Sequence, residues 1–295
     1  MSKKALIIMN PCSGTKRANK YLTEIVEIFT VNDYFCTVMT TTKRGDGTIY
    51  AREYGKHFDL IACIGGDGTF NEVVSGVMQA GLRIPIGYIP AGSTNDFASS
   101  LHIPKNIVQA AKNIVHGDPV AFDIGSFNER SFSYVASFGA FTKTSYNTPQ
   151  NVKNALGHLA YILDGITSIA SIRAEHMAIE ADGVTYEDDY IFGAISNSTS
   201  IAGILTLKPE LVDMSDGLFE LILVKAPRDL IEVADLAHLV TTQNYESSML
   251  TFVNAKEFRI HASSETSWTL DGEYQEGCEE ILVENKHHAI NLMIK

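Results

Sequence analysis

Residues 61–74, IACIGGDGTFNEVV, place a glycine-rich turn directly after an apolar run and directly before a segment with helical spacing. Backbone N–H groups in such a turn can approach an anion closely, and the following helix directs its positive dipole end to the same place. Neither the GxxxxGK[ST] pattern nor GxGxxG is present. The stretch therefore indicates a phosphate-binding turn, with a purely structural tight turn as the alternative.

Asp67 is the acidic residue of this turn. A carboxylate repels phosphate unless a divalent cation or a network of hydrogen-bond donors lies between the two. The sequence therefore leaves two roles open for Asp67, the recruitment of magnesium and the bracing of the loop.

Two other loops carry small, hydroxyl and amide residues after apolar runs. Asn10 to Gly14 (NPCSG) follows the first run, and Pro90 to Phe97 (PAGSTNDF) follows the fourth. Thr40, Thr41 and Thr42 follow the second run. In an open parallel sheet such loops gather at the carboxyl edge, where ligands bind. We expect these loops and the glycine-rich turn to form one phosphate cradle.

The elements that must position these loops alternate in type. Apolar runs at 4–10, 35–41, 60–65 and 84–90 predict strands, and helical spacing predicts helices at 18–29, 46–58 and 69–81. This alternation predicts a parallel sheet covered on both faces. After about residue 123 the segments are typical of antiparallel strands, interrupted by two predicted helices near 150–170 and 228–244.

Composition excludes several classes of protein. The net charge of −12 argues against a nucleic-acid partner. Residues 1–60 hold nine Lys and Arg against six Asp and Glu, a net of +3, which leaves −15 for the rest. Lys16, Arg17, Lys20, Lys43 and Arg44 could face an anionic membrane or nucleotide phosphates, although a solvated face explains any single one of them.

The chain has no apolar run near the roughly 18 residues of a membrane span, and its N-terminus is interpreted as a first strand and not as a signal peptide. The four cysteines lack metal-ligand spacing, which favours reduced thiols and a cytoplasmic protein. The histidines also lack metal spacing, and we expect surface or partly buried side chains at His158, His176, His238 and the pair His287–His288.

The set NPCSG, GGDGTFNE and PAGSTNDFA resembles the diacylglycerol kinase catalytic-domain family, in particular the soluble bacterial lipid kinases, with sphingosine and ceramide kinases as eukaryotic relatives. GGDG is also shared with NAD kinases and phosphofructokinases. The similarity continues as KPELVDMSDGLFELILV at 208–224 and TLDGE at 269–273, so it covers nearly the whole chain. Where many relatives have Gly-Thr, this chain has Gly92-Ser93-Thr94, which leaves open which hydroxyl contacts the nucleotide.

The resemblance implies an α/β ATP-binding domain at 1–123, optionally joined by 288–295, and a mostly antiparallel β-sandwich at 124–287 that closes the cleft and takes the lipid substrate. It implies that ATP is contacted by the following residues: Asn10, Pro11, Cys12, Ser13, Gly14, Thr41, Gly65, Gly66, Asp67, Gly68, Thr69, Asn71, Gly92, Ser93, Thr94 and Asn95.

For metals, the resemblance assigns Asp67 to the catalytic Mg²⁺, with Asp96 and Asp123 completing its network. It also implies a structural Mg²⁺ held by Asp213, Asp216 and the main-chain carbonyl of Leu218. The alternative for the latter segment is a DxxDG hairpin turn.

Phosphoryl transfer to an alcohol needs a group that accepts the hydroxyl proton. Asp271 and Glu273 in TLDGEYQ are candidates because Gly272 permits a tight turn that projects a carboxylate, and the resemblance favours the same DGE. The sequence does not separate the two acids, and a plain hairpin turn is the alternative.

These patterns predict an ATP- and Mg²⁺-dependent lipid kinase, with diacylglycerol as the first candidate substrate. The enzyme is expected in the cytoplasm, transiently at the inner face of an anionic membrane, and a homodimer is one option for its assembly. The alternatives are a kinase of a soluble metabolite of the NAD kinase type, and a nucleotide-binding regulator that has lost catalysis.

Overall fold

The computed structural model describes residues 2–139, 173–201, 205–229, 231–236 and 247–295. The chain divides into two compact units, Met1–Ile124 with His287–Lys295, and Gly125–Lys286. The predicted helix near 150–170, His158 and His238 lie outside the described residues. Of the predicted helix near 228–244, residues 228–229 and 231–236 are described, and only 231–236 are helical.

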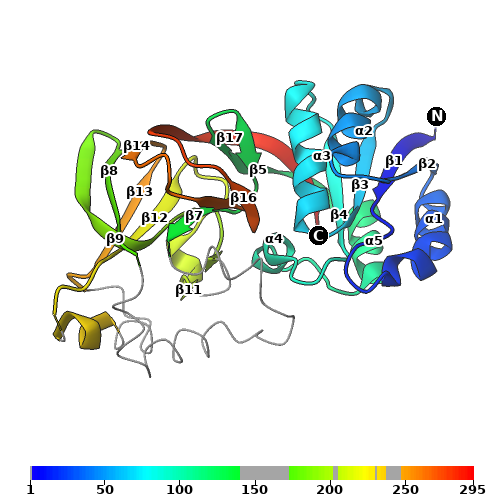
Figure 1. Ribbon diagram of the computed structural model, residues 1–295. Coiled ribbons are helices and arrows are strands. Elements are labelled where there is room, and N and C mark those ends of the chain that lie inside the picture. Colours follow the sequence, from blue (N-terminus) through cyan, green and yellow to red (C-terminus); the bar gives the residue numbers. More distant parts are fainter. Residues whose placement is uncertain (1, 140–172, 202–204, 230, 237–246) are drawn as a thin grey trace. The chain divides into compact units, whose positions relative to one another are not determined.

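The first unit contains a parallel sheet in the order β2-β1-β3-β4-β17, and Figure 1 shows its strands side by side. Its strands are β1 (Lys3–Met9), β2 (Tyr34–Thr40), β3 (Leu60–Gly65), β4 (Pro85–Pro90) and the end of β17 (Glu280–Ile294). The first four begin and end within one residue of the predicted strands. The predicted parallel sheet is confirmed.

Helices cover both faces of this sheet. The helices are α1 (Leu22–Val31), α2 (Asp46–Tyr54), α3 (Asp67–Gln79), α4 (Asp96–Ser100) and α5 (Ile107–His116), with short 3-10 turns η1 (Arg17–Tyr21) and η2 (Gly55–His57). Helices α1 and α5 lie on one side of the strands and α2 and α3 on the other (Figure 1). The inner strands are therefore buried on both faces, which explains their continuous apolar runs.

The second unit consists mainly of antiparallel strands. They are β5 (Asp118–Phe127, from Gly125 on), β6 (Arg130–Phe132), β7 (Val135–Gly139), β8 (Glu175–Ala181), β9 (Val184–Ser196), β12 (Phe219–Lys225), β13 (Leu250–Ala255), β14 (Glu257–Ala262), β15 (Trp268–Leu270), β16 (Glu273–Gln275) and the first half of β17. A separate short pair joins β10 (Ser200–Ile201) to β11 (Leu205–Thr206), and η3 (Pro209–Leu211) precedes β12. Trp268 lies in the apolar core, with Phe127 and Phe138 against its ring.

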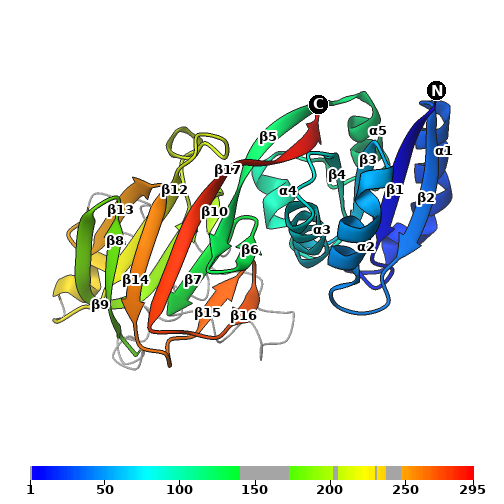
Figure 2. The ribbon, with the colours of Figure 1, turned by 90° about the horizontal axis from the view of Figure 1, so that it is seen from above.

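Two strands, β5 and β17, pass from one unit to the other and pair with each other. Figure 2 follows β17 from the second unit to the C-terminus. Ile124 is the last residue of the first unit before the chain leaves it, and His287 is the first after the chain returns. None of the helices in the described part of the chain has the length and apolar content needed to span a bilayer.

Candidate functional site

The structure brings three of the predicted loops into backbone contact at the carboxyl ends of β1, β3 and β4. The amide of Asn10 donates to the carbonyl of Ile64 (2.9 Å), and that of Ala91 donates to the carbonyl of Gly65 (2.7 Å). A Cβ atom added to Gly92 would lie only 2.5 Å from Cα of Gly66. Side chains are excluded at this contact, so the loops come close enough to present their backbones to one ligand.

Gly14 fixes the first loop against the third. Its φ is +52°, a region that favours glycine, and an added Cβ would lie 2.5 Å from the carbonyl oxygen of Ala91. Gly65 is similarly restricted, since a Cβ there would lie 2.5 Å from Cβ of Thr69. The glycines of the motif are therefore required by the packing of the loops themselves.

Two asparagine side chains brace the cradle from within. Oδ1 of Asn10 accepts from the amide of Cys12 (2.9 Å), and its Nδ2 donates to Oγ1 of Thr69 (3.1 Å). Asn95 has a left-handed φ of 56°, accepts from the amide of Gly92 (2.9 Å) and donates to its carbonyl (3.0 Å). Ser93, which lies between Gly92 and Asn95 in the third loop, is exposed. These hydrogen bonds brace the loops without using the Ser93 hydroxyl.

The remaining predicted nucleotide residues lie in or beside the same loops. Ser13, in the first loop, is buried, and Thr94, like Ser93, is exposed. Pro11 accepts through its carbonyl from Nδ2 of Asn19 (3.1 Å), and Asn71, in α3, accepts from Oγ of Ser75 (3.2 Å). Gly68 is half-buried in the first turn of α3.

Asp67 is the first residue of α3, and its two carboxylate oxygens have different surroundings. Oδ2 accepts from the backbone amide of Asp96 (3.2 Å). This hydrogen bond joins the glycine-rich turn to the third loop. Oδ1 is buried and has no hydrogen-bond partner among the described residues. Burial raises the pKa of Asp67, and the backbone N–H of Asp96 opposes that rise. A buried, unsatisfied carboxylate oxygen beside a phosphate-type cradle fits Mg²⁺, which prefers oxygen ligands.

The DGE segment forms the turn of a hairpin in the second unit. Leu270 pairs with Glu273 across a two-residue turn in which Asp271 (φ 50°) and Gly272 (φ 81°) are both left-handed, as a type I′ turn requires. Asp271 is buried, and its oxygens accept three backbone amides from residues 133–135 at 2.6–3.1 Å. Glu273 is more exposed and forms an ion pair with Nη2 of Arg130 (2.7 Å).

Comparison with known proteins identifies the family. Residues 4–127 match the model of the diacylglycerol kinase catalytic domain, and residues 136–293 match that of the YegS C-terminal NAD kinase β-sandwich-like domain. A protein of Bacillus subtilis (strain 168) named diacylglycerol kinase is 34% identical over 276 residues, which are 92% of this chain and 90% of the relative. The chain belongs to the diacylglycerol kinase catalytic-domain family. The resemblance drawn from the motifs is confirmed, and so is the fold class.

Other relatives agree. A diacylglycerol kinase of Staphylococcus aureus (strain MRSA252) is 32% identical over 279 residues, 93% of this chain and 87% of its own length. A crystal structure from Bacillus anthracis str. Sterne, named as a candidate diacylglycerol kinase, has a TM-score of 0.81 at 26% identity and covers 99% of this chain and 95% of its own.

In this family member, Thr41 is held by a backbone contact, and the loop after it is held by an acid whose role sequence reasoning missed. Thr41 is buried, and its amide donates to the carbonyl of Met9 (2.8 Å). Glu72 of GGDGTFNE accepts from the amides of Gly45 (2.8 Å) and Gly47 (3.0 Å). The sequence hints at this role of Glu72 only through the glycines of the segment GDGT at 45–48, whose backbone N–H groups need an acceptor from another part of the chain.

The acidic loop of the kinase before β12 consists of successive side-chain-capped turns. Oδ1 of Asp213 accepts from the amide and hydroxyl of Ser215 (3.0 and 2.7 Å), and Oδ1 of Asp216 accepts from the amide of Leu218 (2.8 Å). The carbonyl of Leu218 accepts from Nδ2 of Asn285 (3.0 Å). The turn alternative is thus present in the structure, and it leaves both carboxylates exposed.

Glu220 adds a third acid that was not predicted. It is 1% exposed, and neither of its carboxylate oxygens has a hydrogen-bond partner among the described residues. Burial, with the nearby charges of Asp216 and Asp213, raises the pKa of Glu220 to about 8. Two carboxylates, a carbonyl and an adjoining unsatisfied acid fit a hard cation in their chemistry.

Asp123 was predicted to join Asp67 and Asp96. The structure places it in the middle of β5, fully buried, where it accepts from the amide of His288 (2.7 Å) and lies 3.0 Å from Nδ1 of His287. Of the three predicted network acids, the structure therefore links Asp67 to Asp96 and gives Asp123 two histidine partners.

Proposed function

We propose that this kinase transfers the γ-phosphoryl group of ATP, with Mg²⁺, to a lipid hydroxyl, and that diacylglycerol is its first candidate substrate. The observation that carries the proposal is the three-loop cradle with the unsatisfied oxygen of Asp67 beside it. The names of the relatives support the lipid acceptor. We assign nucleotide binding to a domain of 1–123 with 288–295, and lipid binding to 124–287.

The cradle suits a triphosphate for two reasons. Residues Gly66 to Gly68 lie at the start of α3, a helix of 13 residues, where backbone N–H groups and the helix dipole attract anions. The exposed hydroxyls of Ser93 and Thr94 add donors that are not needed to brace the loop. Mg²⁺ held by Asp67 would neutralise charge on the phosphates.

We assign the general base to Glu273 and a positioning role to Asp271. The carboxylate of Asp271 accepts three backbone amides from residues 133–135, so its charge serves that segment. Glu273 is more exposed, and its ion pair with Nη2 of Arg130 (2.7 Å) orients the carboxylate. In the reaction, the acceptor O–H proton passes to Glu273 while the new P–O bond forms and the γ-phosphorus separates from ADP.

We further propose that a structural Mg²⁺ is bound by Asp213, Asp216 and the Leu218 carbonyl. Peripheral contact with an anionic membrane would involve Lys16, Lys43 and Arg44, from the part of the chain with a net charge of +3. Cytoplasmic location with transient contact at the inner membrane face, and a homodimer as one option for the assembly, complete the proposal.

The test measures phosphate transfer from labelled ATP with Mg²⁺ to vesicles containing diacylglycerol, to vesicles lacking it, and to NAD. Label is expected in the diacylglycerol vesicles alone. Transfer to NAD would favour the soluble-metabolite alternative. ATP binding without transfer to any acceptor would favour a regulator.

Two variants separate the acids. Glu273→Gln should lower kcat by about 10² to 10⁴ with ATP affinity and melting temperature near wild type, because it removes only a proton acceptor. Asp271→Asn should also lower the melting temperature. The side-chain NH₂ group of Asn would face the backbone N–H groups of residues 133–135, and the lost hydrogen bonds would cost about 1–3 kcal/mol. Wild-type activity in Glu273→Gln would refute the assignment of the base.

A further inference from the structure

His287 and His288 have an arrangement that a regular strand does not allow. Neighbouring residues on a strand point to opposite faces, yet these two rings are stacked with their centroids 3.6 Å apart. The cause lies in the backbone, because His288 has a left-handed φ of 50°. The rings therefore point the same way.

The burial pattern of β17 marks the same position. Before the pair in the sequence, the buried residues of β17 are Ile281, Val283 and Asn285. After the pair they are Ile290 and Leu292. The alternation thus changes from odd to even numbers across 287–288. One extra residue is accommodated there, as in a β-bulge, a feature that re-aims side chains and is frequent beside functional sites.

Both rings point to the carboxylate of Asp123 on β5. Nδ1 of His287 lies 3.0 Å from Oδ1 of Asp123, and one potential ligand atom from each of Asp123, His287 and His288 lies within 4.8 Å of the other two. The amide of His288 donates to the same Oδ1 at 2.7 Å, which fixes the carboxylate against the bulge. Among the described residues, no other three side chains of His, Cys, Asp and Glu converge in this way.

We propose that Asp123, His287 and His288 bind a transition-metal ion, with Zn²⁺ as the best-matched ion. Zn²⁺ takes imidazole nitrogen and carboxylate oxygen at about 2.0–2.2 Å, which places tetrahedral ligands about 3.3 Å apart. The Asp123–His287 contact needs only a small opening to reach that separation. Mg²⁺ prefers oxygen ligands, so this site is distinct in chemistry from one that serves phosphates.

The site leaves coordination positions open. His287 and His288 are exposed, whereas Asp123 is buried, so an ion approaches from the imidazole side and keeps water in its remaining positions. Once bound, it ties β17 to β5 at the residues where the chain leaves and re-enters the first unit. The sequence concealed the site because Asp123 is 164 residues from His287 and because adjacent histidines are separated on a regular strand.

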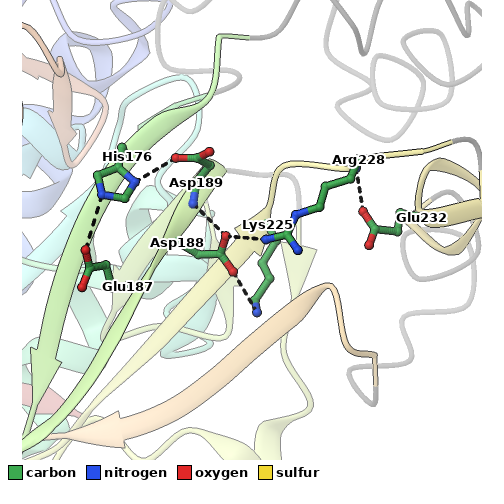
Figure 3. Close-up of polar contacts among 7 residues, drawn as sticks. All are labelled: His176, Glu187, Asp188, Asp189, Lys225, Arg228 and Glu232. Atoms are coloured by element: carbon green, nitrogen blue, oxygen red, sulfur yellow. Dashed lines mark hydrogen bonds and ion pairs between the residues drawn. The ribbon is translucent and has the colours of Figure 1, made fainter.

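His176 provides a matched control from the same protein (Figure 3). It is also an exposed histidine beside a carboxylate, but it has two, with Nδ1 2.8 Å from Asp189 and Nε2 3.5 Å from Glu187. The two acids approach opposite nitrogens of one ring, however, so the three groups cannot chelate one ion. Chelation, and not the mere presence of histidine and acid, is what separates the two clusters.

The experiment titrates tag-free protein with Co²⁺ and follows its visible absorption, then displaces the Co²⁺ with Zn²⁺. The test variants are His287→Gln and His288→Asn, the latter chosen because Asn tolerates a left-handed φ. Circular dichroism checks that each variant folds. Wild type and His176→Gln are expected to bind one ion with equal affinity, and each test variant should bind at least about tenfold more weakly, at the lower end of what altered metal sites lose.

Several results would overturn the proposal. The absence of Co²⁺ and Zn²⁺ binding in the wild type would do so, as would wild-type affinity in either folded test variant. An equal loss in His176→Gln would show scattered surface binding. Displacement of Co²⁺ by a similar concentration of Mg²⁺ would indicate an all-oxygen site elsewhere in the protein.

Discussion

The replacement of Glu220 by Gln tests whether this buried acid is as poorly compensated as the structure indicates. The carboxyl is 1% exposed, lacks hydrogen-bond partners among the described residues and has its pKa raised to about 8. The folded state holds the proton of Glu220 more tightly than the unfolded state does. The contribution of this group to the free energy of unfolding is therefore fully present below about pH 4.5 and is lost as the pH rises towards 8. Gln has the size of the protonated acid and does not titrate.

The magnitude follows from the pKa shift. Each unit corresponds to about 1.4 kcal/mol, so a shift from 4.5 to about 8 costs the wild type up to about 5 kcal/mol at high pH. Between pH 5 and pH 8 the difference in unfolding free energy between Glu220→Gln and the wild type should grow by about 3–4 kcal/mol, as an upper figure. All other titrating groups are common to both proteins and cancel in this difference.

The assay is denaturant unfolding in excess EDTA, followed by the fluorescence of Trp268. This is the single tryptophan of the chain, and it is buried in the core of the unit that contains Glu220. Its signal therefore reports the unfolding of that unit. Stability curves that run parallel from pH 5 to pH 8 would show that Glu220 is compensated in the folded protein and would refute the reasoning.

Three other outcomes are expected. Gly14→Ala should weaken the binding of a fluorescent ATP analogue at least about tenfold, because the added Cβ meets the Ala91 carbonyl. Gly81→Ala, at a glycine with a φ of +62° but open space around it, should bind the analogue normally. Equal effects would mean that backbone strain alone matters. Asp216→Ala should reduce the rise in melting temperature that Mg²⁺ gives the wild type without changing ATP affinity, and an unchanged rise would exclude the structural ion at this loop. Binding to anionic vesicles should fall between 0.1 M and 1 M salt as the Debye length drops from about 10 Å to about 3 Å, and binding insensitive to salt and lipid charge would rule out electrostatic membrane contact.

Much of the first unit could be predicted because its signals are local. Continuous apolar runs at 60–65 and 84–90 become β3 and β4 within a residue, since strands buried on both faces must be apolar throughout. The loops after them were placed together correctly, because parallel strands bring their carboxyl ends to one edge. Helix α5 was missed, although IVQAAKNIVH has helical spacing and Asn106 caps it by accepting from the amide of Gln109.

The parts that escaped prediction depend on contacts between distant residues. Asp271 and Glu273 are two positions apart and equally acidic, and only the approach of residues 133–135 separates a saturated carboxylate from a more accessible one. Likewise, Glu220 and Lys225 are the two charged residues of an otherwise apolar strand, FELILVK, and the sequence does not show that Glu220 is buried. Its burial follows from the strands on either side of it, β9 and β13, which no local pattern reveals.

The buried acids of this kinase differ in how completely the protein satisfies their oxygens, and that difference indicates their roles. Asp46 accepts three hydrogen bonds from Thr42 and Lys43, and Asp271 accepts three backbone amides, so both are structural anchors. Asp67 leaves one buried oxygen unsatisfied and Glu220 leaves two. An unpaired buried carboxylate is costly unless it is protonated or meets a cation. The two under-satisfied acids lie beside the two loops proposed to bind Mg²⁺, which is where a compensating charge would have the largest effect.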